Sequence, residues 1–345
     1  MTRPTMFLLR LGTLSLRWRV RSLIACALLL AIVLWLAALL IATGTLSFTP
    51  GEVIASLVGR STDPMTQRVI TLVRIPRALT AILVGGALGM AGAIFQSISR
   101  NALGSPDIIG FTTGAATGAI MQIILYNAGP VQTSAAAVIC GVATAAVVFL
   151  LSLHGRTSGG YRLVLVGIGV GATLSGVNTV VLVMGDLDQT ASAQLWLAGS
   201  LDTRSWSHVI PAAVGFALII PVVLSFARNL NILEMGDDVA RELGIPVERT
   251  RLVLVMAAVG LTSIATAAAG PIAFIALAAP QIARRLTASP GVPVVGGALT
   301  GMVLLMAADL VSQHLPLAAN LPIGLTTGLL GGVYLLWLLA RRTSI

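Results

Sequence analysis

Polar side chains inside apolar stretches are the first candidates for function in this sequence, because they are costly in a membrane and usually mark a pathway or a binding site. The stretch 163–184 carries Thr173, Ser175 and Asn178 near its middle. Helical spacing places Ser175 and Asn178 on one face. This face either lines a translocation path or holds a hydrogen bond between two helices.

Gln96 and Asn101 flank the inner end of another apolar stretch, 78–97, on either side of Arg100. A polar gate across a path and ordinary capping at the membrane surface predict the same residues here. Both residues are therefore gate candidates. Asp309, near the outer end of its own stretch, is either a functional acid or part of an interfacial ion pair.

Catalytic constellations are missing. The sequence has no H-E-x-x-H and no G-x-S-x-G motif, its three histidines are isolated, and all 21 basic residues are arginine. A chain without lysine can form neither a Walker A phosphate loop nor a Schiff base. We predict a chain that is not an enzyme, with no catalytic residue, no metal site and no bound cofactor; ATP and Mg²⁺, if used, belong to a partner subunit. A transported metal would arrive already chelated.

Composition places the chain in a membrane. Of 345 residues, 57% are hydrophobic and 10% are charged, with a mean hydropathy of +0.97. Soluble domains carry about 25% charged residues, and disordered chains have low hydrophobicity, so both classes are excluded. The net charge of +9 comes from arginines scattered between apolar stretches, which is typical of membrane topology signals and not of a nucleic-acid surface.

The elements that must position these residues are membrane-spanning helices, each about 20 apolar residues long. We expect an all-α protein with ten spans: 22–43, 78–97, 108–126, 134–153, 163–184, 206–227, 251–268, 272–287, 294–312 and 322–340. They form one domain, 22–340, between a basic segment, 1–21, and a tail, 341–345. Small residues recur four apart, which is typical of helices that approach closely in lipid; examples are Gly85/Gly89, Gly297/Gly301 and Gly324/Gly328/Gly332.

Ten spans place both termini on one side of the membrane. That side then holds 16 arginines and the other side 5, namely Arg60, Arg68, Arg74, Arg77 and Arg204. The excess of positive charge predicts that both termini are cytoplasmic.

The longest cytoplasmic loop, 228–250, has the clearest local signals outside the spans. It holds five of the twelve acidic residues. A glycine break, an aspartate N-cap and a Gly-x-Pro stop delimit a short helix: Gly236, Asp237 or Asp238, Gly244 and Pro246. Val239, Ala240 and Leu243 give this helix an apolar face. It is either a solvated turn or, as we favour, an element that docks on another protein.

Arg74 and Arg77 lie on the side where the charge rule disfavours arginine. Pro76 separates them and is expected to end any helix running through it. The two arginines either anchor the chain to lipid phosphates or pair with carboxylates of a docking protein, which the planar guanidinium holds well.

Together these motifs resemble the permease subunits of bacterial ABC importers for iron–siderophores, which are relatives of the vitamin B12 importer permease. The likeness runs from about residue 30 onward and is strongest to ferric-enterobactin-type permeases. The segments that carry it are 74–77 (Arg-Ile-Pro-Arg), 85–96, 100–110, 233–240 with 243–244, 270–280 and 321–324.

The resemblance implies a type II ABC importer permease of ten helices in the bacterial cytoplasmic (inner) membrane, which moves a ferric siderophore. It implies as partners a second permease, in a heterodimer or homodimer, two ATP-binding cassette ATPases, and a periplasmic or lipid-anchored substrate-binding protein that docks at Arg74 and Arg77. Coupling to the ATPase falls on the cytoplasmic loop: Leu233, Glu234, Gly236, Asp237, Asp238, Val239, Ala240, Leu243 and Gly244.

The sequence departs from the family pattern at two places. Gln281 stands where the family commonly has histidine, and Ser312-Gln313 where relatives often have arginine. Within the family, vitamin B12 or haem are alternative substrates. From another class, an ion-coupled secondary transporter predicts acidic residues at mid-membrane, whereas the acids here avoid the span centres. An intramembrane enzyme is a third alternative and lacks a catalytic set.

Overall fold

The computed structural model describes residues 6–11, 14–44, 46, 48–59, 63–106, 110–154, 157–158, 160–289, 291–314 and 322–341. Parts of several predicted segments lie outside these ranges: residues 1–5 and 12–13 of the basic segment, 107–109 of the 100–110 motif, 321 of the 321–324 motif and 342–345 of the tail.

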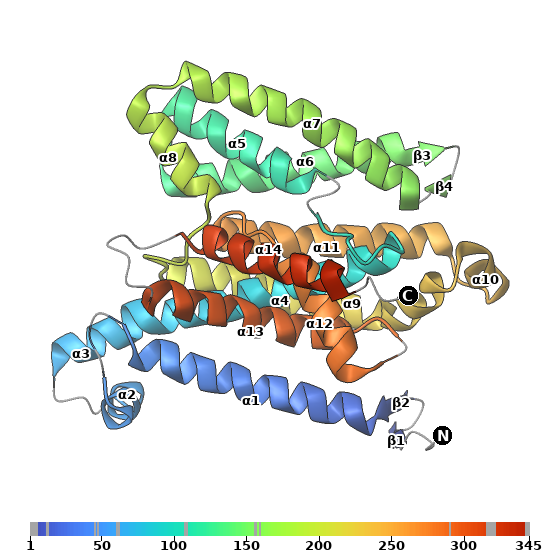
Figure 1. The fold of residues 1–345 in the computed structure, drawn as a ribbon, viewed down its shortest axis with the longest axis horizontal. Helices are drawn as coiled ribbons and strands as arrows, with labels where there is room; N and C mark the ends of the chain where they lie inside the picture. The colour runs from blue at the N-terminus through green and yellow to red at the C-terminus, as the bar shows by residue number, and fades with distance from the viewer. Residues whose placement is uncertain are drawn as a thin grey trace.

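Helices make up most of the described chain (Figure 1). The longer ones, in chain order, are α1 (Val20–Ala42), α4 (Ile75–Ile98), α5 (Phe111–Tyr126), α6 (Pro130–Ser152), α7 (Gly160–Met184), α9 (Trp206–Glu234), α11 (Val247–Ala269), α12 (Ile275–Thr287), α13 (Val294–His314) and α14 (Ile323–Arg341). The shorter ones are α2 (Pro50–Leu57), α3 (Pro64–Val69), the π-helix η1 (Ile70–Arg74), α8 (Leu187–Leu197) and α10 (Asp237–Glu242).

Each predicted span falls on one of the longer helices, and seven helices of the described residues are long and apolar enough to cross a membrane. Two predicted spans are shorter than expected. α5 has 16 residues and α12 has 13; at 1.5 Å per residue α12 covers about 20 Å of a hydrocarbon core of about 30 Å. The expected all-α fold is confirmed; beside the helices lie two small antiparallel pairs that the sequence analysis did not predict, β1 (Met6–Leu11) with β2 (Leu14–Arg19) and β3 (Leu153–His154) with β4 (Thr157–Ser158).

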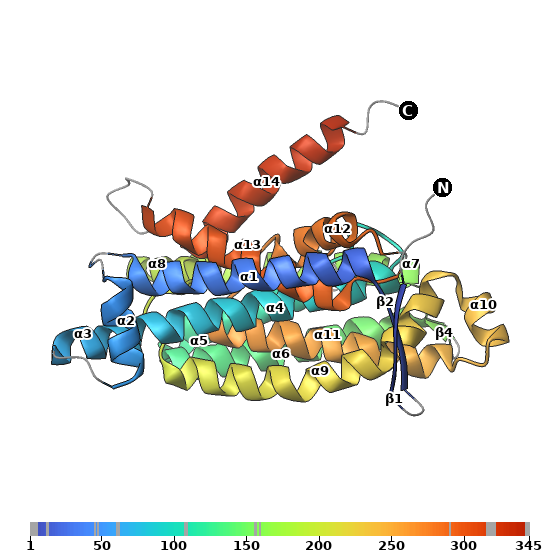
Figure 2. The ribbon, with the colours of Figure 1, turned by 90° about the horizontal axis from the view of Figure 1, so that it is seen from below.

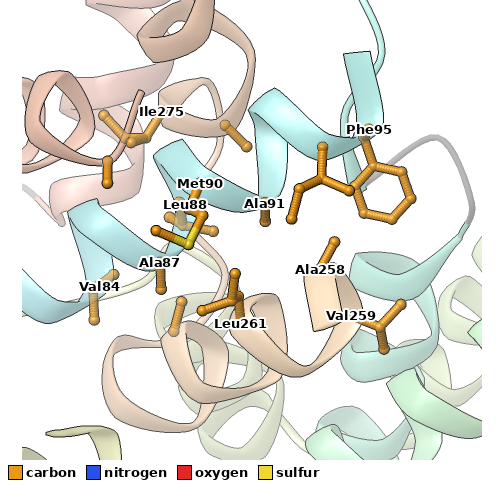
Figure 3. Close-up of a cluster of buried hydrophobic side chains, with 14 of the residues drawn as sticks. Val84, Ala87, Leu88, Met90, Ala91, Phe95, Ala258, Val259, Leu261 and Ile275 are labelled. Carbon is orange, nitrogen blue, oxygen red and sulfur yellow. The ribbon is translucent and has the colours of Figure 1, made fainter. Parts of the chain in front are cut away.

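The core is centred on α4, which lies between α13, α11, α12 and α9 (Figures 1 and 2). Figure 3 shows the apolar side chains where α4 meets α11 and α12, with Met90 and Ala91 of α4 close to Leu261 and Ala258 of α11. All four of these residues are buried. α4 is therefore surrounded by protein, whereas α1, α6, α7 and α9 bury only a minority of their span surface.

Glycines let α4 and α13 approach each other at backbone distance. A Cβ placed on Gly89 would lie 2.1 Å from the carbonyl oxygen of Gly297, and one placed on Gly301 would lie 2.1 Å from that of Gly85. The predicted glycine pairs therefore face one another across one helix–helix contact, which gives close packing without a hydrophobic driving force in lipid.

The helix entering the core does not end at Pro76, contrary to the sequence-based expectation. α3, η1 and α4 form one helical segment from Pro64 to Ile98. A proline ring clashes with the carbonyl four residues earlier in a regular α-helix. Here the residues before Pro76 form a π turn, whose wider loop re-routes these hydrogen bonds and lets the helix continue.

The remaining helices form the sides of the molecule. α5, α6, α7 and α8 form a group on one side of the core (Figure 1), while α14 leans away from the helix bundle (Figure 2). α1 begins at the end of the molecule that carries α10, and α14 runs toward that end (Figure 2). The site residues predicted from the sequence are thus distributed over the two ends and one side of the molecule.

Candidate functional site

The predicted docking helix exists, with a different N-cap from the one expected. Gly236 occupies the N-cap position of α10 with a φ of 132°, a conformation that residues with a side chain rarely adopt. Neither Asp237 nor Asp238 caps the helix, because both lie within its first turn. The helix ends at Glu242, and the predicted stop follows it: Gly244 has a φ of 75°, and the amide of Ile245 donates to the carbonyl of Ala240 over 2.9 Å.

The exposed apolar surface of α10 differs from the predicted face. Ala240 is fully buried against the bundle, so it is a packing residue and is not available to a partner. Val239 and Leu243 are exposed, and Met235, which directly precedes the Gly236 break and which the sequence analysis missed, is 70% exposed. Leu233 is buried as well. Met235, Val239 and Leu243 form an exposed apolar group that we call the α10 face.

Ion pairs fix α10 to the rest of the chain. The Asp237 carboxylate accepts hydrogen bonds from Nη2 of Arg251 at 2.8 and 2.9 Å and pairs with Arg100 from the α4–α5 connection. Arg251 is 3% exposed and also pairs with Glu248. Glu234 pairs with Arg284 of α12 over 2.7 Å. Sequence reasoning missed Arg251; its signal was an arginine at the start of an apolar span.

The two arginines control the protonation of Asp237. Burial opposes the charged form, but the hydrogen bonds and charge of Arg251, together with the charge of Arg100, outweigh burial and lower the pKa of Asp237. Because the pKa of Asp237 is lower in the folded chain than in the unfolded chain, its ion pairs stabilise the fold at neutral pH. This contribution is lost only when the pH falls below the ordinary aspartate pKa of about 3.9 and then through the lowered pKa of the folded state. The ion pairs are therefore intact at any physiological pH.

Gln96 and Asn101 line a polar cavity of about 460 Å³ beside α10. Its other lining residues are Arg100, Ala102, Glu234, Gln281, Arg284 and Arg285. The Gln96 amide donates to the carbonyl of Leu277 over 2.8 Å, and Asn101 Oδ1 accepts from the amide of Leu103 over 2.9 Å. Gln281, where the family commonly has histidine, donates to the carbonyl of Ala102 over 2.8 Å.

Ser175 and Asn178 line a second cavity, of about 370 Å³, on the side of the molecule. Residues of α5 and α14 form other parts of its wall, among them Thr112, Thr113 and Leu325. The Asn178 amide donates to the carbonyl of Thr113 over 3.4 Å, while Thr173 bonds within its own helix. Among the described lining residues of this cavity all are uncharged, and the polar ones carry hydroxyl or amide groups.

At the opposite end of the molecule, the Arg74 side chain is bound by groups of the same chain. It is 8% exposed; its guanidinium donates to the carbonyl of Ile41 in the last turn of α1 and to those of Thr43 and Leu46 just after this helix, and it lies over the ring of Phe48. This placement corrects the prediction of a docking role for Arg74, because the group that would pair with a partner is already buried.

Arg77 is the centre of an ion-pair cluster. It donates to both carboxylate oxygens of Asp309, at 2.7 and 3.0 Å, and pairs with Asp202 over 2.6 Å. Asp309 is 1% exposed and accepts a further bond from Gln313 over 3.0 Å. Of the two alternatives for Asp309, the structure has the ion pair. Gln313, part of the departure from the family pattern, is bound to this cluster.

Comparison with known proteins identifies the family. The sequence matches the FecCD transport family over residues 27–341. The chain belongs to this family. It is 41% identical to the ferric enterobactin transport system permease protein FepG of Escherichia coli (strain K12) over 94% of this chain and 97% of that protein. It is 34% identical to the hemin transport system permease protein HmuU of Yersinia pestis over 83% and 87%.

A solved structure has the same fold. An inward-facing metal-chelate type ABC transporter superposes with a TM-score of 0.82 at 27% identity, covering 92% of this chain and 98% of that one. The FecCD chain described here is therefore a permease subunit of the ABC importer type, and the expectation of an iron-chelate permease is confirmed.

Proposed function

We propose that this FecCD permease carries a ferric siderophore across the bacterial cytoplasmic membrane, in a complex in which other subunits hydrolyse ATP. The observation that carries the proposal is the exposed α10 face of Met235, Val239 and Leu243 in a chain of this family. An exposed apolar group on a short, anchored helix fits a groove on an ATPase, with Asp238 and Glu242 at its rim. The chain itself contributes no covalent chemistry; it opens and closes a path as a two-state element.

The complex we propose has ten spans in this chain, with both termini cytoplasmic. α5, α12 and α14 complete the count, because each packs beside one of the seven full-length spans. A second permease covers the outward-leaning α14, and a different chain is our preferred partner. A substrate-binding protein delivers the chelate at the end opposite α10.

Within this complex Ser175 and Asn178 line the path, and Gln96 and Asn101 lie at its cytoplasmic gate. The uncharged hydroxyl and amide lining of the 370 Å³ cavity supports the first assignment, because weak polar contacts let a chelate enter and leave. Arg77 remains our candidate for docking the binding protein, since its side chain is 24% exposed. Arg74 is no longer a candidate, because it is only 8% exposed.

The test is uptake into proteoliposomes that contain the permease pair and the ATPase. Radiolabelled iron is offered as ferric siderophores of several classes, as ferric citrate and as haem, with cobalamin as the vitamin B12 comparison, each with its binding protein. We expect ATP-dependent uptake of a ferric siderophore. Uptake only of haem or cobalamin rejects the substrate, and uptake driven by an ion gradient without the ATPase rejects the transporter class.

A further inference from the structure

Arg100 has an unusual backbone conformation at the end of α4. Its φ is 48°, in the left-handed region. The amide of Arg100 donates to the carbonyl of Ser97, and that of Asn101 to the carbonyl of Gln96, both over 3.1 Å. This pattern closes a helix with a left-handed residue that is usually glycine. An arginine is strained in this position, and such strain persists where the side chain has a role.

The Arg100 side chain reaches α10, where it pairs with Asp237. Asp237 is in turn held by Arg251 at the start of α11. Arg100 therefore connects the helix proposed to contact the ATPase with the α4–α5 connection, which begins at its own backbone.

The same connection leads to the cavity on the side of the molecule. Gln281 of α12 holds its first part through the carbonyl of Ala102. It ends at Gly110, which lies against the backbone of Gly167 in α7. α5 follows directly, and Thr112 and Thr113 of its first turn line the cavity with Asn178. α10 is thus joined to the cavity wall by the Arg100–Asp237 ion pair and by the chain from Arg100 to Thr112, of which residues 107–109 lie outside the described residues.

We infer that Arg100 is a positioning residue that transmits the movement of α10 to the α4–α5 connection and through it to the path. The inference rests on the proposed function, since it requires an ATPase bound at α10. Arg100 does not touch the chelate in this role. Its ion pair makes α10 and the α4–α5 connection move together, so that ATP binding changes the cavity wall at Ser175 and Asn178.

The test uses two variants that keep the left-handed turn and remove the guanidinium. Arg100→Gly relieves the backbone strain, and Arg100→Asn places a residue that tolerates this conformation. Arg100→Lys keeps a charge that can pair with Asp237. Arg249→Asn is the matched control, because Arg249 is an exposed arginine on the first turn of α11 and is not one of the arginines paired with Asp237.

The first readout is uptake per ATP hydrolysed in the complete complex. We expect Arg100→Gly and Arg100→Asn to lower this ratio about fivefold or more, which is the lower end of typical coupling between sites. Assembly of the complex and its basal ATPase activity should be unchanged. The unfolding temperature of Arg100→Gly should be equal to or higher than that of the unaltered protein. Arg100→Lys should recover most of the ratio. A ratio within about twofold of the unaltered complex in both variants, or loss of the ATPase subunit from them, overturns the inference.

The second readout does not depend on the substrate. Ser175→Cys is introduced in a chain lacking Cys26 and Cys140, and its labelling by a hydrophilic thiol reagent is compared between nucleotide-free and ATP-trapped complexes. We expect the difference between these states to disappear on adding Arg100→Gly. If the difference persists, the inference is wrong. If the unaltered complex transports none of the chelates but shows the labelling difference, the substrate proposal fails and the Arg100 link is still tested.

Discussion

The cluster around Asp309 shows how one buried charge is accommodated at a membrane surface. Asp309 is 1% exposed, and both its carboxylate oxygens accept hydrogen bonds, from Arg77 and from Gln313. Arg77 also pairs with Asp202, from the connection between α8 and α9. Three segments distant in the sequence are thereby joined by one guanidinium.

We predict that Arg77→Gln destabilises the permease by about 3–5 kcal/mol, because breaking a buried ion pair leaves an uncompensated charge. The measurement is thermal unfolding of the purified permease pair in detergent, with Arg68→Gln as the control at an exposed arginine on α3. Asp309→Asn should cost less than Arg77→Gln, since it removes the buried charge. Equal stability of Arg77→Gln and the control contradicts the prediction.

At this scale the sequence predicts which residues matter better than it predicts what they touch. Arg74 and Arg77 stood out because the charge rule disfavours them, yet both are bound by groups from distant segments of the same chain. For Asp309 the sequence analysis offered an ion pair as one of two alternatives, but it did not identify the partner, which is Arg77 of another helix. Partners that converge from distant segments have no local spacing, so a single sequence cannot pair them.

At the scale of the elements, α10 is a short helix at one end of the bundle, with one side packed and the other exposed. Its inner side is set by Ala240 and by the Asp237 ion pairs, and its outer side is the α10 face. An element fixed on one side and apolar on the other can transmit force to the chain that holds it.

We predict that Leu243→Asp weakens ATPase retention by about 2 kcal/mol, because a leucine buried in the interface contributes about 1.5–3 kcal/mol. Retention is measured by pull-down of the ATPase with the tagged permease, and uptake should fall in parallel. Leu187→Asp, at an exposed leucine of α8 at the opposite end, is the control and should leave retention unchanged. Full assembly and uptake with Leu243→Asp would show that α10 does not bind the ATPase through this face.

Hydropathy located the elements well, and local sterics located their ends less well. Every predicted span overlaps a helix, because long apolar runs have few alternatives in lipid. Two of the misplaced boundaries lie at Pro76, where a π turn lets the helix continue, and at α12, which begins only at Ile275. Both depend on how neighbouring helices pack, which no sequence window contains.

For the whole molecule, α14 is a long helix of which the described part has little support from its own chain. It leans away from the bundle in Figure 2, and a Cβ added to Gly328 or Gly332 would meet nothing within 4 Å. Gly324, by contrast, lies against the carbonyl oxygen of Ala198, at 2.2 Å from its ideal Cβ. Only the first glycine of this predicted small-residue stripe is used within the chain.

We predict that Gly328→Leu leaves the single permease folded and weakens its pairing with the second permease by about 1–3 kcal/mol, the usual cost of overfilling a packed contact. Pairing is measured by the fraction of two-permease complex in detergent, and folding by the unfolding temperature of the single chain. Gly51→Leu on α2, also open around its Cβ, is the control. Unchanged pairing with Gly328→Leu means that the second permease does not cover this part of α14.

The π turn at Ile70–Arg74 also determines how α3 is rotated about the helix axis relative to α4. A π turn holds one residue more than an α turn, and one residue corresponds to about 100° of rotation about the helix axis. Deleting any one residue from this turn would restore a regular helix but rotate α3 by that angle against α4. For a deletion at Thr71, Leu72, Val73 or Arg74, Ile70 would rotate out of its fully buried position. Loops usually tolerate small deletions. The segment before α4 does not, because one residue of the π turn determines which side chains of that segment face the core.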